Sequence, residues 1–462
     1  MKGVKVFTII IFTAMLIVPL ALFNFKPDAV SEIDNSKLAP SPVGSAANKS
    51  VEFKDRLENY LSDRIGLRDK MILGYTVIND VVFRKMVNTP YIYGKDSEVF
   101  GAGITEEHKG SDEGYIAIAD MIQQMQEYCK HKKVPFLFVL DPSKAAVLTQ
   151  KLPSSVKYDR SYVDKFLEEL KKRGINYVDN TQTLIQTKDS GKAVFNKKYD
   201  VDSFNETGAY YSTLNALKKL KATSPKLHIN EESEFDITTE TKTSLSGVKY
   251  PINEKIPVYT PKTPTKSIAD KYSGLMLDST FHSFDYVIND TRKSQGCPKA
   301  LVFQGSGMFR YGHKFLENAF GECVQIHGYK NAANMPAYFN LFKPQCVIFE
   351  LEDYAMTSNY FDFDSMKGIK FNPSYAKVKN APKEDVAMSY GQLDIKKNEQ
   401  FTEIIWKADE RYEAAWLMMG KEFDLVKTKE GYSVIVPTAE REKFTGKLQI
   451  IAYKDGRRYN FT

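Results

Sequence analysis

A serine held between two glycines is the residue of this chain best suited to covalent chemistry. The apolar run Ala300–Phe303 leads into Gln304-Gly305-Ser306-Gly307, and a segment with helical character follows. In α/β folds such a strand–turn–helix junction lifts a serine hydroxyl above the carboxyl end of a strand. The pattern makes Ser306 a candidate nucleophile. A tight turn that caps the following helix is the alternative.

A serine nucleophile needs a neighbouring base, so the histidines bear directly on whether Ser306 can react. His313 follows Ser306 by seven residues, His282 precedes it, and His327 ends the next predicted strand. None of the three stands in a recognisable base motif. A histidine nitrogen within about 3.5 Å of the serine hydroxyl, itself held by a carboxylate, would supply the base.

Strands that alternate with helices are expected to position these residues. Continuous apolar runs predict buried strands at 134–140, 300–303, 324–327 and 346–351. Apolar residues at helical spacing predict helices at 111–132, 159–173, 205–220 and 311–320. This order predicts an α/β fold with a parallel sheet flanked by helices.

Composition narrows the class of protein. The chain has 462 residues, 42% of them hydrophobic, and a net charge of +6 without a basic stripe, which favours a globular protein and argues against nucleic-acid binding. The four cysteines are far apart, so they predict no metal site, and nothing in the sequence implies a cofactor. Lys144, after a predicted core strand, and Arg310 are candidate contacts for an anionic substrate, although exposed surface charge is the ordinary role of such residues.

The N-terminal segment has the length of a membrane span. Lys2 and Lys5 precede the uncharged run 6–25, and Lys26 closes it. About 20 apolar residues cross a hydrocarbon core, and basic residues ahead of them favour a cytoplasmic N-terminus with the rest translocated. An uncleaved anchor is the prediction, because the end of the run offers no clean small-x-small cleavage site. A cleaved signal peptide is the alternative.

The remaining sequence divides by composition. We expect a membrane anchor or signal segment at 1–25, a flexible stalk at 26–50 and the α/β domain at 51–361, with a polar insertion near 221–266. A linker at 362–400 and a small β module at 401–462 follow. Alternating strands and the turn Asp455-Gly456 predict that module. Trp406 and Trp416 within it are expected in its core, with stacking on sugars as the alternative.

Six short motifs, in order, carry a family resemblance over residues 53–354. They are Asp63-Arg64-Ile65-Gly66-Leu67-Arg68, Ile92-Tyr93-Gly94-Lys95-Asp96, Asp141-Pro142-Ser143-Lys144, Phe204-Asn205-Glu206-Thr207-Gly208-Ala209-Tyr210, Gln304-Gly305-Ser306 and Phe342-Lys343-Pro344-Gln345-Cys346-Val347-Ile348. They resemble the SGNH-like, alginate O-acetyltransferase-type proteins of bacterial envelopes, an AlgX/AlgJ-like family that includes the group named after its DHHW motif.

The resemblance implies a triad of which this chain keeps one part. In the family the serine of a Gly-Asp-Ser motif carries the acyl group, and Ser306 matches it. The family's Asp and His align with Val201 and Ser203, or with Asp200 and Asp202 after a one-residue slip. Asp202 is a weak candidate for the base and Asp200 a weaker candidate site residue, because an ordinary carboxylate pKa near 3.9 suits general-base chemistry poorly.

Two functions are consistent with this pattern. The preferred hypothesis is an extracytoplasmic, membrane-anchored and catalytically degenerate relative that binds glycan or a partner during envelope polysaccharide modification. The alternative is an active O-acetyltransferase or acetylesterase that acts on a cell-wall or secreted polysaccharide through Ser306. The resemblance also implies, weakly, a membrane protein that donates acyl groups as a partner.

Overall fold

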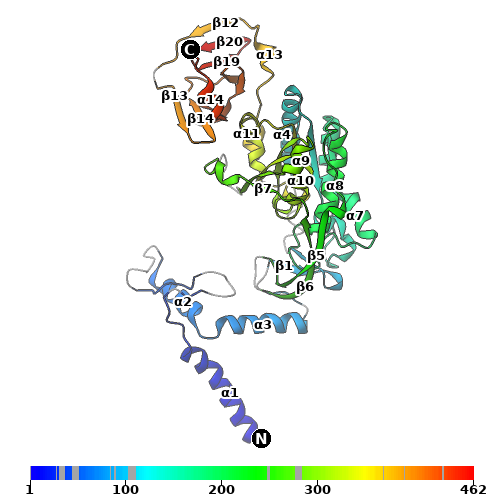
Figure 1. Cartoon of the computed structure of the whole chain (residues 1–462). Coiled ribbons are helices and arrows are strands. Elements are labelled where there is room, and N and C mark those ends of the chain that lie inside the picture. Colours follow the sequence, from blue (N-terminus) through cyan, green and yellow to red (C-terminus); the bar gives the residue numbers. More distant parts are fainter. Residues whose placement is uncertain are drawn as a thin grey trace. The chain divides into compact units, whose positions relative to one another are not determined.

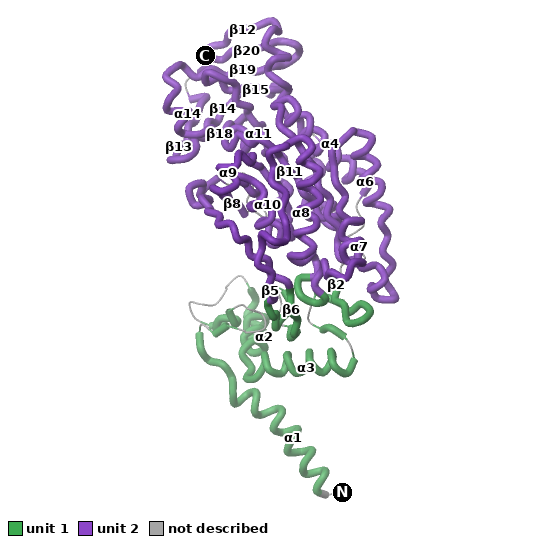
Figure 2. Tube along the Cα trace, turned by 45° about the vertical axis from the view of Figure 1, so that its right-hand side comes forward, with its two compact units in different colours: residues 1–102, 197–200, 240–256 green, residues 103–196, 201–239, 257–462 purple. Residues whose placement is uncertain are grey.

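The chain folds as two units, each assembled from segments that are distant in the sequence (Figure 2). The computed structural model describes residues 2–27, 29–30, 37–43, 51–83, 85–87, 90–101, 111–246, 250–275, 283–367, 369–389, 391–428 and 431–462. The first unit comprises residues 1–102, 197–200 and 240–256, and the second comprises the rest of the chain. Ser306 therefore belongs to the second unit and the predicted membrane span to the first.

The first unit begins with the apolar helix α1 (Figure 1). Helix α1 (Lys2–Ala21) is followed by α2 (Phe53–Arg64), α3 (Arg68–Phe83) and the antiparallel pair β1 (Tyr91–Tyr93) and β2 (Val99–Gly101). Residues Gly3–Ala21 have a mean hydropathy of 2.4 and are long enough to cross a membrane. A signal sequence has the same length and composition, so either an anchor or a signal peptide fits α1.

A seven-stranded sheet organises the described part of the second unit. Its strand order is β4-β3-β11-β9-β10-β8-β7. The bounds are β3 (Phe136–Asp141), β4 (Tyr177–Asp179), β7 (Lys266–Ser267), β8 (Ser283–Ile288), β9 (Lys299–Gln304), β10 (Glu322–His327) and β11 (Cys346–Glu352). In this order the strands from β4 to β10 are parallel to one another, as the sequence predicts. At the other edge β8 is antiparallel to β10, and β7 is antiparallel to β8. The connection from β8 to β9, residues 289–298, is shorter than the roughly dozen residues that a parallel crossover needs.

Helices cover both faces of this sheet. The helices are α4 (Asp112–His131), α5 (Lys144–Val147), α6 (Ser161–Lys172), α7 (Thr181–Asp189), α8 (Glu206–Lys221), α9 (Asp290–Ser294), α10 (His313–Ala319) and α11 (Met335–Phe342). One core joins α4, α6 and α11 to alternate strand residues such as Phe138 and Phe303, and the other joins α7, α8 and α10 to residues such as Val139 and Val302. The strands are buried on both faces, which explains why they are apolar without alternation.

The C-terminal part of the second unit consists of two small sheets. One has the order β12-β20-β19-β15-β16 and the other β13-β14-β18-β17. The bounds are β12 (Lys383–Val386), β13 (Leu393–Lys397), β14 (Phe401–Trp406), β15 (Ala414–Met418), β16 (Glu422–Asp424), β17 (Val426–Thr428), β18 (Gly431–Pro437), β19 (Gln449–Lys454) and β20 (Arg457–Phe461). Helix α14 (Thr438–Lys443) follows β18. Asp455 and Gly456 join β19 to β20 with φ of 50° and 76°, as the Asp-Gly turn predicts.

The stretch expected as a linker, 362–400, takes part in these sheets. It contains α12 (Phe363–Lys367), α13 (Tyr375–Val378), β12 and β13. Strand β12 pairs with β20, and β13 pairs with β14, so both strands complete sheets whose other members lie further along the chain. Short charged strands such as 383–386 carry no apolar alternation, and for this reason composition alone describes them as a linker.

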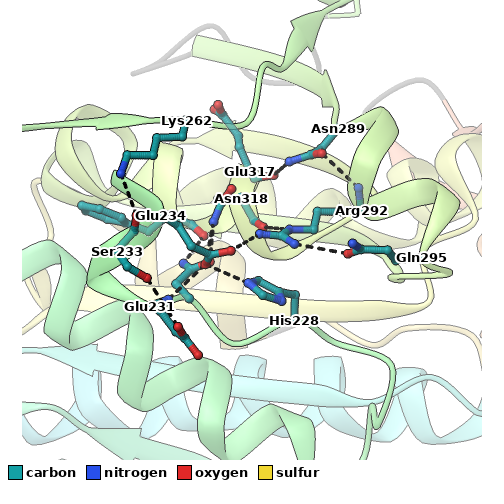
Figure 3. Close-up of polar contacts among 12 residues, drawn as sticks. His228, Glu231, Ser233, Glu234, Lys262, Asn289, Arg292, Gln295, Glu317 and Asn318 are labelled. Carbon is teal, nitrogen blue, oxygen red and sulfur yellow. Dashed lines mark hydrogen bonds and ion pairs between the residues drawn. The ribbon is translucent and has the colours of Figure 1, made fainter. Parts of the chain in front are cut away.

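The polar insertion expected near 221–266 contains a two-stranded hairpin, β5 (Phe235–Ser244) with β6 (Pro251–Pro261). A polar network ties the start of this segment to α9 and α10 (Figure 3). Arg292 forms an ion pair with Glu234, and its Nε donates to the carbonyl of Asn318 at 2.8 Å. His228 Nε2 lies 2.8 Å from the other Glu234 oxygen. Burial alone would raise the pKa of Glu234, but hydrogen bonds from His228 and Arg292 lower it.

A candidate serine–histidine site

Ser306 lies at the point where a buried strand turns into a helix. Strand β9 is buried from Ala300 to Gln304, and Ser306 is partly exposed just beyond it. A wide helical turn, Met308–Gly312, then leads into α10. The hydroxyl is therefore presented at the carboxyl edge of the sheet, as the glycine-flanked pattern predicts.

Both glycines beside Ser306 are required by close packing. A Cβ on Gly305 would overlap the hydroxyl of Tyr329. A Cβ on Gly307 would lie 2.5 Å from Glu352 Oε1 and 2.7 Å from Ser203 Oγ. These distances are shorter than any ordinary contact of a Cβ, so the turn admits glycine alone without displacing its neighbours.

A histidine lies within hydrogen-bond distance of the serine. Ser306 Oγ is 3.0 Å from Nε2 of His327, which ends β10. Strands β9 and β10 are parallel neighbours with His327 opposite Gln304, so both residues emerge at the same edge of the sheet. The imidazole also stacks on Phe309, with the ring centroids 5.4 Å apart and an interplanar angle of 24°. This is the geometry of a nucleophile and its base.

Of the other two candidate histidines, the structure describes only His313, which does not stand in this position. His313 opens α10, and burial lowers the pKa of its imidazole. His282 lies outside the residues that the structure describes.

The loop that aligns with the family's Asp and His contributes a different contact. Val201 is buried, and Ser203 donates its hydroxyl to Glu352 Oε1 at 2.9 Å. Asp202 is exposed, and Asp200 is a buried residue with a left-handed φ of 47°. Ser203 of this loop is therefore linked to the serine turn by its hydrogen bond to Glu352. The histidine beside Ser306 is His327 of β10.

Buried carboxyl groups lie beneath the serine turn. Strand β11, on the other side of β9 from β10, carries Glu350 and Glu352 at its end. Glu350 Oε2 accepts the Gly305 amide at 2.8 Å, and Glu352 accepts the Gly307 amide and the Tyr354 hydroxyl, the latter at 2.8 Å. Strand β9, which leads to Ser306, thus runs between β10, which carries His327, and β11, which carries the two acids.

Burial changes the protonation of these acids. It raises the pKa of Glu352 to about 7 and that of Asp141, at the end of β3, to about 6. It also raises the pKa of Glu350 well above its usual range, and the nearby charge of Asp141 adds to this. Asp141 and Glu352 are register partners on adjacent parallel strands, so their charges would repel one another. Protons are therefore retained in this cluster near neutral pH.

A cleft opens beside Ser306 and His327. Three tyrosines and one lysine contribute to its lining, namely Tyr329, Tyr354, Tyr360 and Lys330. The rings of Tyr354 and Tyr360 meet edge to face at 6.0 Å between centroids, as do those of Tyr329 and Tyr360. The space between these side chains is small and largely enclosed, with room for little more than a water molecule.

The two basic residues singled out from the sequence lie elsewhere. Lys144 is 2% exposed, and its Nζ donates to the carbonyl of Asn196 at 2.7 Å. Arg310 is exposed, with its guanidinium 5.8 Å from the ring centroid of Tyr311. Among the described residues that line the cleft, neither of them occurs.

Comparison with known families finds a match in an earlier part of the chain than Ser306 and His327. Residues 92–253 match the model of a family described as SGNH hydrolase-like domain, acetyltransferase AlgX. This stretch is similar to an AlgX-type SGNH-like domain. Ser306 and His327 lie beyond the matched residues, so the assignment of the domain and the roles of these two residues rest on separate observations.

The solved structures to which this chain is similar are distant from it in sequence. PatB1 of Bacillus cereus is 17% identical with a TM-score of 0.46, over 59% of this chain and 99% of that chain. The O-acetyltransferase domain of Pseudomonas putida AlgJ is 14% identical with a TM-score of 0.42, over 60% and 98%. A DHHW family protein of Eubacterium siraeum is 12% identical with a TM-score of 0.43, over 62% and 98%. No curated protein matches this chain in sequence.

The sequence analysis does not single out the two buried acids beneath the serine turn. Glu350 and Glu352 alternate with apolar residues at the end of a buried run. Two carboxyl groups two residues apart point to the same face of a strand, which is a detectable signal. This signal does not reveal what the two carboxyl groups bind, because the amides that they accept belong to a turn nearly fifty residues earlier in the chain.

Proposed function

We propose that this protein transfers or hydrolyses acyl esters on an extracytoplasmic polysaccharide, with Ser306 as nucleophile and His327 as base. The 3.0 Å separation of Ser306 Oγ and His327 Nε2 carries the proposal. The AlgX-type domain supports acetyl as the acyl group, because its family is described as an acetyltransferase. The base comes from β10, which replaces the histidine that the Val201–Ser203 loop lacks.

The reaction follows two balanced steps. In the first, Ser306 Oγ attacks the carbonyl carbon of the acyl donor while His327 Nε2 takes the hydroxyl proton. The bond to the donor's leaving oxygen breaks, and that oxygen departs with the proton, which leaves an ester on Oγ. In the second step a glycan hydroxyl or a water attacks this ester and gives its proton to Nε2. Oγ regains a proton from the imidazolium, and the acylated glycan or free acid leaves.

The surroundings of Ser306 support ester chemistry on a sugar. The carboxyl group of Glu352 is neutral over much of the range up to about pH 7, so it does not oppose the negative charge that develops on the attacked carbonyl. The half-buried rings of Tyr354 and Tyr360 border the pocket beside Ser306, and aromatic rings of this kind pack well against sugars.

Location follows from α1. We infer that α1 is retained as an anchor with a cytoplasmic N-terminus, which places the AlgX-type domain outside the cytoplasm. An envelope or secreted polysaccharide is then the accessible acceptor. A membrane protein that supplies acyl groups would be a compatible donor.

A binding function is the second candidate, and the serine turn itself favours it. The Gly305 and Gly307 amides are engaged by Glu350 and Glu352 rather than directed at a substrate oxygen. A turn stabilised in this way holds its shape without an acyl group. On this hypothesis the tyrosine-lined cleft retains glycan while Ser306 stays unmodified.

Active-site labelling separates the two candidates. A fluorophosphonate should form an adduct on Ser306 of the wild type, and peptide mass spectrometry should locate it there. His327→Ala should greatly slow labelling, whereas Asp202→Asn should label at the wild-type rate. Absence of an adduct together with saturable glycan binding that persists in Ser306→Ala would establish the binding function instead.

A further inference from the structure

A buried arginine fastens the segment that leaves α1. Arg64 is 1% exposed, although it ends an otherwise accessible helix. Its Nε donates to the carbonyl of Ala39 at 2.7 Å, and its Nη1 donates to those of Asn24 and Lys26 at 3.1 and 2.6 Å. Nη2 reaches the carbonyl of Pro27 at 3.2 Å. The guanidinium thus binds backbone carbonyls immediately beyond the apolar run.

The start of α3 is fixed to the last turn of α1. The Gly66 amide donates to the carbonyl of Pro19 at 2.8 Å, and the Asn24 amide donates to that of Arg64 at 2.8 Å. A Cβ on Gly66 would overlap Leu22, so the two backbones are in direct contact. Helix α3 begins two residues later, at the level where α1 ends.

Thr76 is the one buried residue of helix α3, and apolar side chains outside the stripe described below, such as Val77, Val81 and Phe83, are exposed as well. Asp80 accepts the hydroxyl of Tyr93 at 2.6 Å. On the opposite side, large apolar residues recur at intervals of four, three and four, and they are 45–65% exposed. These residues, called the α3 stripe, are Met71, Tyr75, Ile78 and Val82. Such spacing places them on one helix face.

We propose that the α3 stripe lies in the membrane–water interface, with lipid as its occupant. This inference rests on the membrane anchoring of α1 in the proposed function. If α1 spans the bilayer, the contact between Gly66 and Pro19 holds the start of α3 at the lipid headgroups. An exposed apolar helix face at that level gains by entering the acyl boundary, and Tyr75 is an aromatic residue of the kind enriched there.

The consequence is a two-point attachment. Helix α1 crosses the bilayer and α3 rests on it, while Arg64 and its carbonyl partners join the two. The orientation of the first unit at the membrane is then fixed by the fold, because α3 is held by its Thr76 and Asp80 face.

Depth-dependent fluorescence quenching of the full chain in vesicles tests the proposal. Cys129, Cys323 and Cys346 are buried, so Cys297→Ser gives a background in which an added cysteine is the accessible thiol among the described residues. An environment-sensitive fluorophore is attached at Ile78→Cys or Val82→Cys, with Lys447→Cys as the exposed control. The chain is reconstituted into phosphatidylcholine–phosphatidylglycerol vesicles and titrated with a nitroxide-bearing lipid or with aqueous iodide.

The stripe positions should be quenched several-fold more strongly by the lipid nitroxide than the control, and less by iodide. Equal iodide quenching at positions 78, 82 and 447 would overturn the proposal. Shielding of the stripe from both quenchers would also overturn it, because a protein surface would then cover α3. In a separate experiment, mass spectrometry of the intact protein from cell membranes shows whether α1 is retained. Loss of α1 would contradict the anchor of the proposed function, whereas retention with iodide-quenched stripe positions would contradict only the interfacial position of α3.

Discussion

Ser306 follows strand β9 and His327 ends the adjacent parallel strand β10, and their Oγ and Nε2 atoms lie 3.0 Å apart. Neither atom depends on a long loop for its position, because each residue follows a strand that is buried in the sheet. This relationship places an imidazole nitrogen beside a serine whose aligned family partners are Val201 and Ser203.

Removal of either partner should abolish ester turnover. We expect Ser306→Ala and His327→Ala each to lower kcat/KM for an acetyl ester by about a thousandfold, because the nucleophile and base act as one unit. The double variant should be little worse than either single one. Turnover of a chromogenic acetyl ester measures this, and Asp202→Asn serves as the control with unchanged rate. A His327→Ala variant with wild-type turnover would contradict the assignment of the base.

Stability should decrease with rising pH because of Glu352. Burial raises the pKa of this carboxyl group from 4.5 to about 7, so the folded state holds a proton that the unfolded state releases. This contribution is fully present below about pH 4.5 and is lost as pH rises through 7. Glu352→Gln should therefore gain stability relative to the wild type at pH 8, by about 3 kcal/mol from a shift of this size. Chemical denaturation at pH 5 and pH 8 measures the difference, and an identical difference at both pH values would contradict the prediction.

The glycine after the nucleophile should not tolerate a side chain. Gly307→Ala places a Cβ against Glu352 and Ser203, and we expect a loss of about 1–3 kcal/mol. The melting temperature and the fluorophosphonate labelling rate should both fall. Gly74→Ala in α3 meets nothing within 4 Å and serves as the control, with an unchanged labelling rate. Equal behaviour of the two variants would show that the serine turn has room for a Cβ.

The network of Figure 3 should stabilise the attachment of residues 228–234 to α9 and α10. Glu234→Gln leaves Arg292, which is nearly buried, without its counter-charge, and we expect a loss of about 1–3 kcal/mol. Since the pKa of Glu234 is lowered, its contribution is present above the usual carboxyl pKa near 4.5 and is lost as pH falls below it. Urea unfolding at pH 7 and pH 3.5 measures this, with the exposed Glu442→Gln as control. A loss at pH 3.5 as large as at pH 7 would exclude the ion pair as its cause.

Much of the α/β domain can be predicted from its sequence, because strands buried on both faces leave uninterrupted apolar runs. Such runs give β3, β9, β10 and β11 and the position of Ser306. The antiparallel direction of β8 depends on the length of a connection, and strand β12 depends on a partner, β20, that lies far along the chain. Neither leaves a local pattern.

Only part of the site can be predicted from the sequence. The sequence predicts that His327 ends a strand. Only the strand order of the sheet shows that this strand lies next to β9. The same order brings Glu350 and Glu352 beneath the serine turn. Sequence motifs record the position of a residue along the chain, whereas this site is defined across strands.

The placement of the two tryptophans limits what intrinsic fluorescence can report. Trp406 and Trp416 are the only tryptophans of the chain, and both are buried in the C-terminal sheets at 1% and 0% exposure. Their emission will follow the unfolding of that region and will be insensitive to a ligand at Ser306. A change of tryptophan emission upon glycan addition would therefore locate the glycan in the C-terminal sheets, and occupancy of the serine cleft requires an extrinsic probe.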